Sequence, residues 1–407
     1  MLQETPTQTI GGRLRVSFGA LNEKPGEEGL AHFLEHNLMT GGSSKYEPEE
    51  SDQVRNIFGS YNAFTGLEET TFPVDMLAED LGLYLNFVSD IAFNPLLNPE
   101  RFEEERNRIL RETADAKGKP DFIDNNAYHE AFFGENDPRT YFILGEEDVI
   151  GSVTPDKLRE FHSRGYGASN MDLILVGALP DNIEDLIKDN FEGRESGENT
   201  RFKFPRNSPL EGIVTIHSPA PEIFNEDRPY ESSAQLDISL FASTRSDPDS
   251  YAVQMLSDIL GGDANSRLFQ RVSQRMGLAY GFRSAYHGAK NEGAIYSGGS
   301  IKAERSNEVI DAVFDEMRIL REDLVPNEVL DRNKRIARYN VLKNFESNKG
   351  HANAIGIKYD RGITTEDHLE KYGAVTPQDV HEVANKYLPS NREHGKYVMM
   401  LRDPLKN

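Results

Sequence analysis

At residues 153–160 the chain reads Val-Thr-Pro-Asp-Lys-Leu-Arg-Glu, and at residues 375–382 it reads Val-Thr-Pro-Gln-Asp-Val-His-Glu. Each copy predicts the start of an amphipathic helix, with Thr as the N-cap and Pro at the first helical position. A predicted strand follows each copy, at residues 171–176 and 396–401. The recurrence of this helix and strand after 222 residues indicates an internal duplication.

A second pair of segments supports the duplication. Residues 98–106 resemble residues 325–333, at an offset of 227. A chain of 407 residues also exceeds the size at which one core keeps growing, so two domains are expected. We therefore predict two like-folded domains of mixed strands and helices, at 1–192 and 211–407, joined by a linker at 193–210 that begins with a polar stretch.

Composition excludes several classes of protein. The net charge of −23 argues against binding to nucleic acid or to an anionic membrane surface, since both need clustered Lys and Arg. The acidity has two possible explanations: acidic side chains keep the surface hydrated in a salty cytoplasm, or their electrostatic field attracts cationic peptides. The acids are spread along the whole chain, which favours the first explanation. No cysteine is present, which excludes disulfides, thiolate metal sites and a cysteine nucleophile. With neither a leader nor a long apolar run, a cytoplasmic protein is expected.

Residues 32–36 read His-Phe-Leu-Glu-His within a predicted helix that has acids at its start and Gly41-Gly42 at its end. On a helix, His32 and His36 lie one turn apart and point the same way, so both rings can reach one zinc ion. Glu35 flanks the pair, where it can take a proton from a water at the open coordination position. The alternative is a surface helix that carries two histidines by chance.

A third ligand is expected from the helix that Asn98 and Pro99 begin. One face of that helix carries an inward stripe in which glutamates occupy two positions that should be apolar, and the stripe consists of Phe102, Glu105, Ile109, Glu112 and Ala116. A buried carboxylate needs a neutralising partner, and a metal ion is one candidate. The two glutamates lie about 10.5 Å apart along the helix, so they cannot both bind one ion. Alternatively, they belong to a solvated acidic face.

The duplication also indicates which domain carries the chemistry. The 227-residue offset places Arg332 and Tyr339 opposite Glu105 and Glu112, and no His-rich run recurs in the second half. The first domain is therefore expected to be catalytic and the second to lack a metal.

Several motifs together resemble the pitrilysin family of inverzincins, which includes insulysin and the mitochondrial processing peptidase. The matching segments are residues 29–36, 61–65 and 105–112 in the first domain, and 265–269 and 277–280 in the second. The 76 residues from His36 to Glu112 are the family's spacing. The resemblance covers almost the whole chain and implies an α+β fold of two homologous domains, each a mostly antiparallel sheet packed against helices.

The resemblance also implies roles for individual residues. His32, His36 and Glu112 would bind one zinc ion per chain, Glu35 would be the general base, and Glu105 would be a supporting acid. The segment Asn62-Ala63-Phe64-Thr65 resembles the strand that receives the substrate as an added β-strand. Its alternative is an ordinary interior strand.

Two departures from the family pattern stand out. Only residues 13–18 form a clear strand before the zinc helix, so the sheet edge is expected to be built differently. In the second domain Tyr280 resembles a residue that helps to hold the substrate or the transition state, yet Ser273 stands where the family often has its paired Arg. Arg271 or Arg275 could substitute.

The expected function is that of a zinc metalloendopeptidase that hydrolyses short unfolded peptides and pairs into a homodimer. One alternative is an inactive structural subunit, like the core proteins of respiratory complexes that share the fold, although all three ligands and the base are present here. Another is a lyase that cleaves S-ribosylhomocysteine, but that family is far shorter and completes its site with a cysteine, which this chain lacks.

Overall fold

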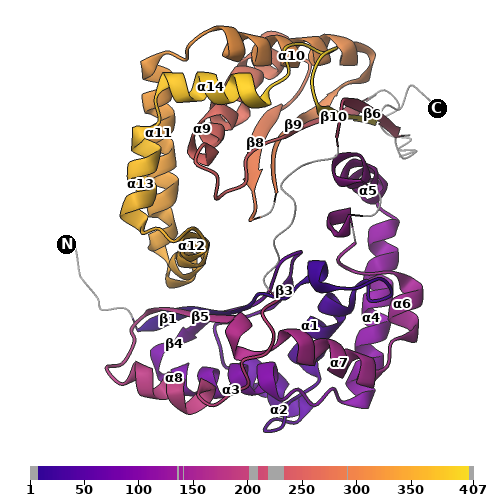
Figure 1. Cartoon of the computed structure of the whole chain (residues 1–407), viewed down its shortest axis with the longest axis vertical. Helices are drawn as coiled ribbons and strands as arrows, with labels where there is room; N and C mark the ends of the chain where they lie inside the picture. The colour runs from indigo at the N-terminus through magenta and orange to yellow at the C-terminus, as the bar shows by residue number, and fades with distance from the viewer. Residues whose placement is uncertain are drawn as a thin grey trace, which may run out of the picture. The chain divides into compact units, whose positions relative to one another are not determined.

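A computed structural model of the protein describes residues 8–134, 137–140, 142–200, 210–218, 233–290 and 292–402. The chain forms two compact units (Figure 1). Unit 1 comprises Met1–Gly118, Tyr141–Lys203 and Leu342–Asp360, and unit 2 comprises Lys119–Thr140, Phe204–Val341 and Arg361–Asn407. The expected linker contains the point where the chain leaves unit 1, although its residues 201–209 lie outside the described residues.

The sheet of unit 1 is built around β1 (Thr9–Val16). This strand pairs antiparallel with β4 (Thr70–Leu77) on one side and with β5 (Met171–Gly177) on the other. Two short strands, β2 (Ser60–Tyr61) and β3 (Phe64–Thr65), pair with the far side of β4 and form that edge of the sheet. The N-terminal strand is thus an inner strand, and β2 and β3 form the edge that carries residues 62–65, the predicted substrate segment.

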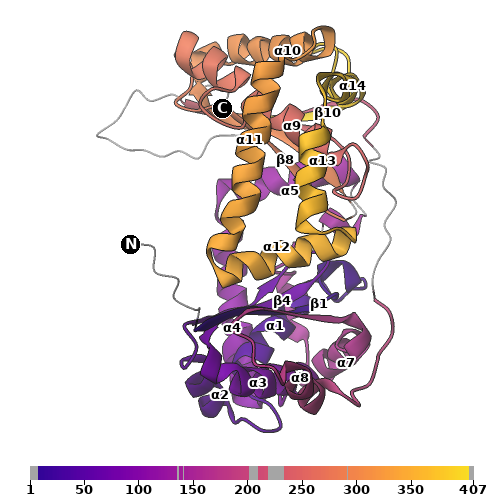
Figure 2. The same ribbon diagram turned by 90° about the vertical axis from the view of Figure 1, so that its left-hand side faces the viewer.

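Helices cover both faces of this sheet. They are α1 (Leu30–Thr40), α2 (Pro48–Arg55), α3 (Leu81–Phe93), α4 (Pro99–Lys117), α6 (Glu147–Ser152), α7 (Pro155–Gly165), α8 (Ile183–Phe191) and α12 (Asn348–Arg361). Figure 2 shows α12 along one face, with α1 and α3 on the opposite face. Asn348 Nδ2 donates to the carbonyl of Thr9 at 2.8 Å, and a Cβ at Gly11 would lie 2.3 Å from the Asn348 backbone. A residue without a side chain is therefore required where α12 crosses β1.

Unit 2 contains a second sheet with the strand order β6-β10-β7-β9-β8. Its strands are β6 (Ile213–Ser218), β7 (Ser233–Phe241), β8 (Arg283–Gly288), β9 (Gly293–Lys302) and β10 (Tyr397–Arg402). Only the β6–β10 pair of these strands is parallel. The helices of this unit are α5 (Pro120–Phe133), α9 (Ser250–Gly261), α10 (Ser306–Glu322), α11 (Asn327–Lys343), α13 (Thr365–Ala374) and α14 (Pro377–Tyr387). The predicted α+β class, with mostly antiparallel sheets packed against helices, is confirmed.

The repeated segments occupy equivalent positions in the two units. The first pair begins α7 and α14, in which Thr154 and Thr376 cap the helix by accepting backbone N–H groups at 3.2 and 3.1 Å. These helices precede β5 and β10, as predicted. The second pair begins α4 and α11.

Neither unit is a continuous stretch of sequence, which differs from the predicted halves. Residues 119–140 belong to unit 2 because α5 packs its aromatic face on that unit's sheet, where Phe132 is fully buried and Tyr128 contacts Tyr296. Residues 342–360 belong to unit 1 because α12 contacts β1. The sequences of α5 and α12 do not show which of the two sheets each helix contacts.

Among the helices in the described part of the chain, none combines the length and the apolar character needed to cross a bilayer.

Candidate metal centre

The helix α1 holds both histidines of the motif. Its apolar residues Leu30, Phe33, Leu34 and Leu38 are fully buried against the core of unit 1. This packing fixes the rotation of the helix and turns His32 and His36 toward a half-buried face. The helix ends at Gly41, as predicted.

The start of α1 differs from the prediction. The acids at 27 and 28 precede the helix and do not lie in its first turn. Instead, the buried carboxylate of Glu23 accepts the backbone N–H groups of Gly29 and Ala31 at 3.0 and 2.8 Å. Glu23 therefore satisfies free N–H groups at the positive end of the helix dipole, next to His32. Glu23 lies six residues before Gly29, outside any local capping motif, so no sequence signal pointed to it.

The second element of the site is α4, which Asn98 caps as predicted, since its Oδ1 accepts the N–H groups of Glu100 and Arg101 at 3.0 and 3.2 Å. Phe102, Glu105 and Ile109 on this helix are buried, as the predicted stripe requires. Glu112 departs from the stripe, because 41% of its side chain is exposed. Its carboxylate instead approaches His36 on α1.

Three potential ligands converge between α1 and α4. Nε2 of His32 lies 3.2 Å from Nε2 of His36, and Oε2 of Glu112 lies 3.8 Å from the latter atom. All three ligand atoms lie within 4.8 Å of one another. Donors at the usual zinc distances of about 2.0–2.1 Å in a tetrahedral site lie roughly 3.4 Å apart, so these residues fit one zinc ion.

The protonation of the two rings also suits a metal. Burial, together with the neighbouring ring of His36, lowers the pKa of His32 to about 3, so His32 is neutral at physiological pH. His36 directs its Nδ1 atom at Oε2 of Glu105, 2.6 Å away. Burial opposes the ionisation of Glu105, but the interactions with His36, Arg108 and Thr40 together outweigh it and hold the pKa of Glu105 below its usual range. With its proton on Nδ1, His36 presents a free lone pair at Nε2.

Glu35 lies beside the three ligands with only 8% of its surface exposed. Burial raises the pKa of Glu35, while a hydrogen bond from the hydroxyl of Thr65 to Oε2, at 2.6 Å, acts in the opposite direction. A carboxylate with a raised pKa is a better proton acceptor than an ordinary surface glutamate. The sequence predicts Thr65 only as part of the substrate strand, and its contact with Glu35, the predicted general base, is an additional finding.

The predicted substrate segment lies at an edge of the sheet, not in its interior. Tyr61 pairs with Val74, and Phe64 and Thr65 pair with Thr71 and Thr70 of β4. In the described residues neither β2 nor β3 pairs with a second strand. Ala63 is buried and Phe64 is 57% exposed. The edge is therefore open to an added strand, next to the residue that contacts Glu35.

Tyr280 and Ser273 belong to unit 2. The side chain of Tyr280 is fully exposed. Ser273 lies in a π-helical turn at Phe269–Arg275, where its hydroxyl accepts the backbone N–H of Phe282 at 3.2 Å. This bond gives Ser273 a structural role within its unit, and the catalytic role of Tyr280 stays a prediction.

Comparison with known proteins places the chain among peptidase relatives. Residues 1–140 match the family model described as insulinase (peptidase family M16), and residues 152–337 match the model described as the peptidase M16 inactive domain. An uncharacterized zinc protease of Rickettsia felis is 26% identical over 397 residues, which cover 94% of this chain and 90% of that protein. One from Bacillus subtilis is 23% identical over 412 residues, with coverage of 100% and 96%.

Two solved structures share the fold. A protease from Helicobacter pylori has a TM-score of 0.84 at 20% identity and covers 98% of this chain and 95% of its own. A structure described as the peptidase M16 inactive domain from Pseudomonas fluorescens has a TM-score of 0.82 at 19% identity, with coverage of 98% and 93%. At these identities the likeness concerns the fold alone.

Proposed function

This chain belongs to the M16 family of zinc metallopeptidases, and we propose that it is itself an active zinc-dependent endopeptidase. The observation that carries the proposal is the convergence of ligand atoms from His32, His36 and Glu112 within 4.8 Å of one another. The buried carboxylate of Glu35 lies next in sequence to His36 on the same helix. A structural protein has no need for two imidazoles and a carboxylate that converge beside a buried proton acceptor.

In the proposed reaction His32, His36 and Glu112 hold one zinc ion, which when bound acidifies a water and polarises a carbonyl oxygen. The carboxylate of Glu35 accepts a proton from the attacking water, whose oxygen bonds to the scissile carbonyl carbon. Glu35 then donates that proton to the nitrogen of the leaving amine as the C–N bond breaks. Glu105 orients His36, and Thr65 orients Glu35.

The substrate class follows from the edge strands β2 and β3. An extended peptide can pair its main chain with residues 62–65 as an added strand, a mode that recognises backbone and imposes little sequence preference. Only an unfolded segment can adopt this conformation, so short unfolded peptides are the proposed substrates. We also propose a homodimer, which light scattering of the purified protein would test.

The alternative, an inactive core-type subunit, has one point in its favour. The family model over residues 152–337 and one structural neighbour are both described as the inactive domain. That model starts beyond all the proposed ligands, however, because His32, His36 and Glu112 lie within residues 1–140, which match the insulinase model.

Substitution of Glu35 by Gln separates the two functions. We expect the wild type and Glu35→Gln to contain about one zinc ion per chain and only the wild type to cleave a quenched fluorescent peptide library. Glu192→Gln, which changes an exposed glutamate of the same unit, serves as the matched control and should cleave normally. An intact, zinc-loaded wild type that cleaves no peptide would favour the inactive subunit, and normal cleavage by Glu35→Gln would exclude the proposed base.

A further inference from the structure

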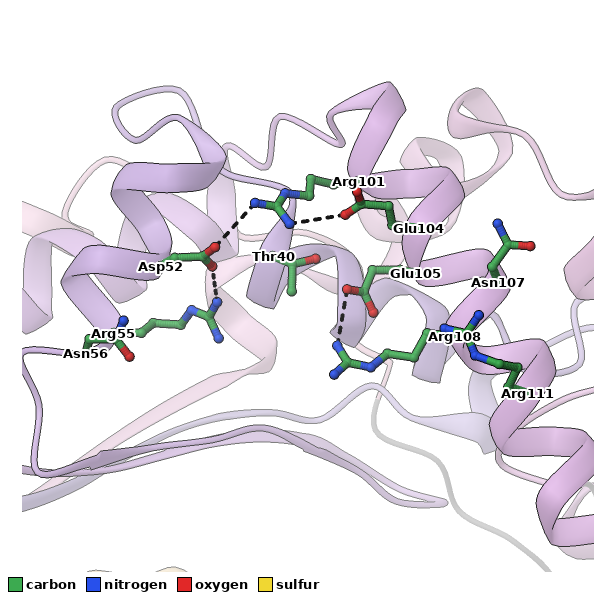
Figure 3. A pocket seen from close by; sticks show the side chains of 10 residues that line it. All are labelled: Thr40, Asp52, Arg55, Asn56, Arg101, Glu104, Glu105, Asn107, Arg108 and Arg111. Carbon is green, nitrogen blue, oxygen red and sulfur yellow. Dashed lines mark hydrogen bonds and ion pairs between the residues drawn. The ribbon is translucent and has the colours of Figure 1, made fainter.

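A cavity of about 770 Å³ opens beside the metal centre, between α2, the end of α1 and α4 (Figure 3). Thr40 closes it from α1, Arg55 lines it from α2, and Arg101, Glu105, Arg108 and Arg111 line it from α4. Its volume is that of a pocket for a small ligand or a side chain. Every lining residue belongs to unit 1.

Positive charge is in excess on the walls of this cavity. Four arginines line it against three carboxylates, those of Asp52, Glu104 and Glu105. One of the three, Glu105, is already engaged by His36 at 2.6 Å. The whole chain carries a net charge of −23, so a cavity with more arginines than carboxylates differs from the chain as a whole.

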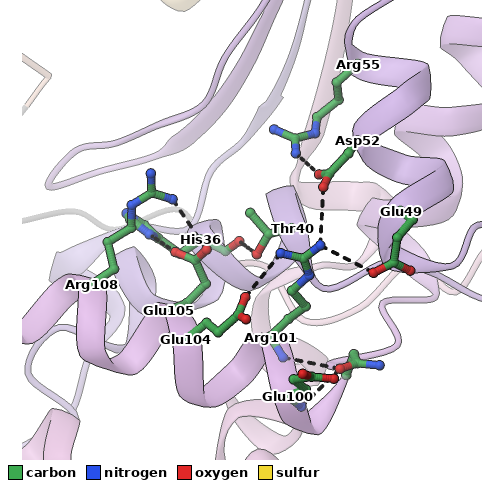
Figure 4. Close-up of polar contacts among 11 residues, drawn as sticks. His36, Thr40, Glu49, Asp52, Arg55, Glu100, Arg101, Glu104, Glu105 and Arg108 are labelled. Atoms are coloured by element: carbon green, nitrogen blue, oxygen red, sulfur yellow. Dashed lines mark hydrogen bonds and ion pairs between the residues drawn. The ribbon is translucent and has the colours of Figure 1, made fainter.

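The four arginines differ in how far their donors are satisfied. Arg101 contacts Glu49, Asp52 and Glu104 at 3.4, 3.4 and 3.1 Å, so it is a structural bridge between α2 and α4 (Figure 4). Asp52, which also pairs with Arg55, is therefore shared between two guanidinium groups.

Arg108 and Arg111 are the least engaged of the four. Arg108 has one long hydrogen bond, at 3.4 Å to Glu105, and lies 3.9 Å from Glu112. Its side chain is 56% exposed. Arg111 forms no ion pair with any other residue of the described ranges, and it too is exposed. An exposed ion pair such as that of Arg108 adds little to the stability of the fold, and Arg111 has none among the residues described. Folding stability therefore does not explain why both side chains line the cavity.

The position of the cavity connects it to the reaction. Glu105 contributes one carboxylate oxygen to His36 and the other to Arg108, and Arg108 also faces the proposed ligand Glu112. In Figure 3 the guanidinium groups of Arg55 and Arg108 extend toward the space between α2 and α4. Because Arg108 lies 3.9 Å from Glu112, a group that Arg108 binds lies close to the proposed metal ligands.

We propose that this cavity is a subsite for a carboxylate of the peptide substrate, with Arg108 and Arg111 as its main donors. The planar guanidinium group binds a carboxylate through two parallel hydrogen bonds, which gives both affinity and orientation. A peptide offers such a group either as an Asp or Glu side chain or as its C-terminal carboxylate. The inference rests on the proposed function, because it assumes that a peptide occupies the metal centre.

Peptide binding tests the subsite without hydrolysis. Fluorescence anisotropy of the zinc-loaded, full-length Glu35→Gln protein would measure the dissociation constants of one labelled peptide in which a Glu or a Gln is moved through successive positions. The same peptide with a C-terminal acid or amide distinguishes the two sources of carboxylate. We expect one placement of the carboxylate to bind about tenfold tighter than its neutral counterpart, as a charge-assisted pair provides.

The arginine variants locate that preference. Arg108→Gln and Arg111→Gln should each reduce the ratio between the affinities for charged and neutral peptides severalfold. Arg111→Gln guards against indirect effects, because Arg111 contacts neither Glu105 nor Glu112 through an ion pair. Arg159→Gln, on α7 and outside the cavity, is the charge-matched control and should keep the ratio.

Two results would overturn the subsite. The first is equal affinity for every matched Glu and Gln peptide and for the peptides with a C-terminal acid or amide. The second is a preference for the carboxylate that persists in the double variant Arg108→Gln Arg111→Gln. Both are independent of the proposed hydrolysis, which is judged by cleavage in the wild type. A protein that cleaves neutral peptides and ignores carboxylates keeps its proposed function and loses this subsite.

Discussion

His36 points its Nδ1 atom at Oε2 of Glu105 across 2.6 Å, which ties the face of α1 that carries both histidines to the buried face of α4. The bond fixes the orientation of the ring and leaves Nε2 free for a metal. His32 has no such support, since its Nδ1 atom is buried without a hydrogen-bond partner among the described residues. The two histidines therefore differ in support, because only His36 has a hydrogen-bond partner at Nδ1 among the described residues.

Replacement of Glu105 by Gln should weaken zinc binding by about 10- to 100-fold, the usual effect of losing such a partner. The amide removes the charge that stabilises the protonated Nδ1 of His36. Competition with a chelator would measure the affinity. Asp115→Asn, an exposed change on the same helix, is the control and should bind zinc as the wild type does. Equal affinities of Glu105→Gln and the wild type would show that the contact with His36 is dispensable.

A second prediction concerns Thr65 and rests on the proposed function. Thr65→Val keeps the shape of the side chain but removes the hydroxyl that donates to Glu35 at 2.6 Å. That bond lowers the pKa of Glu35 against the effect of burial, so its loss should raise the pKa further. We expect a lower kcat, an acidic limb of the rate profile shifted to higher pH, and unchanged zinc content.

Thr71→Val provides the control for this variant. Thr71 lies on β4 opposite Phe64 and is buried, but its hydroxyl does not contact Glu35 in the structure. Its pH profile should match that of the wild type. The role of Thr65 in orienting the base would be refuted by a Thr65→Val enzyme whose kcat and profile equal those of Thr71→Val.

Much of the candidate site follows from local sequence signals. The spacing of His32 and His36 on one helix face, and the cap formed by Asn98 and Pro99, are short-range features that the structure reproduces. The fold class also followed from the duplication and from the family resemblance. These signals extend over one or two helical turns, where the backbone period alone decides which side chains meet.

The other features of the site and the fold depend on contacts between segments that are distant in the sequence, and such contacts cannot be predicted from local sequence patterns. Glu112 was expected on the buried face of α4, yet the rotation of α4 set by Phe102 and Ile109 leaves it partly exposed. The bond between Thr65 and Glu35 joins β3 to α1. The exchange of α5 between the units depends on which sheet its aromatic side chains meet.

That exchange predicts a stability effect. Phe132 of α5 is fully buried, with its ring centroid 5.3 Å from that of Tyr128 and 5.8 Å from that of Phe241 in unit 2. Phe132→Ala should lower the free energy of unfolding by about 3–5 kcal/mol, the usual cost of such a cavity. Hydrogen exchange should show lost protection in β7 and β9. Phe64→Ala, at an exposed phenylalanine of unit 1, should change stability by less than about 0.5 kcal/mol. Protection of β7 and β9 that is unaltered in Phe132→Ala would argue against the assignment of α5 to unit 2.

The last prediction concerns acid stability and the buried carboxylate of Glu27, just before α1. Arg164 donates to both of its oxygens at 2.9 and 2.7 Å, and Lys157 lies 2.8 Å away. Burial would raise the pKa of Glu27, but these hydrogen bonds outweigh it and lower the pKa to about 2 from the ordinary value of 4.5. A carboxyl whose pKa is depressed by folding contributes stability that is fully present above pH 4.5 and is lost as the pH falls toward 2.

We therefore expect the free energy of unfolding of the wild type to fall by up to about 3 kcal/mol across this window on account of Glu27. Glu27→Gln should be less stable at neutral pH, because it leaves Arg164 without its partner, and should lose less stability on acidification. Denaturant titrations at several pH values would measure both effects, with Glu192→Gln as the exposed control. Glu27 lies two residues before Gly29, the N-cap of α1. Loss of its ion pairs with Arg164 and Lys157 should therefore also weaken zinc binding at acid pH before the fold is lost. A Glu27→Gln protein with the same acid transition as the wild type would assign that transition to other carboxylates.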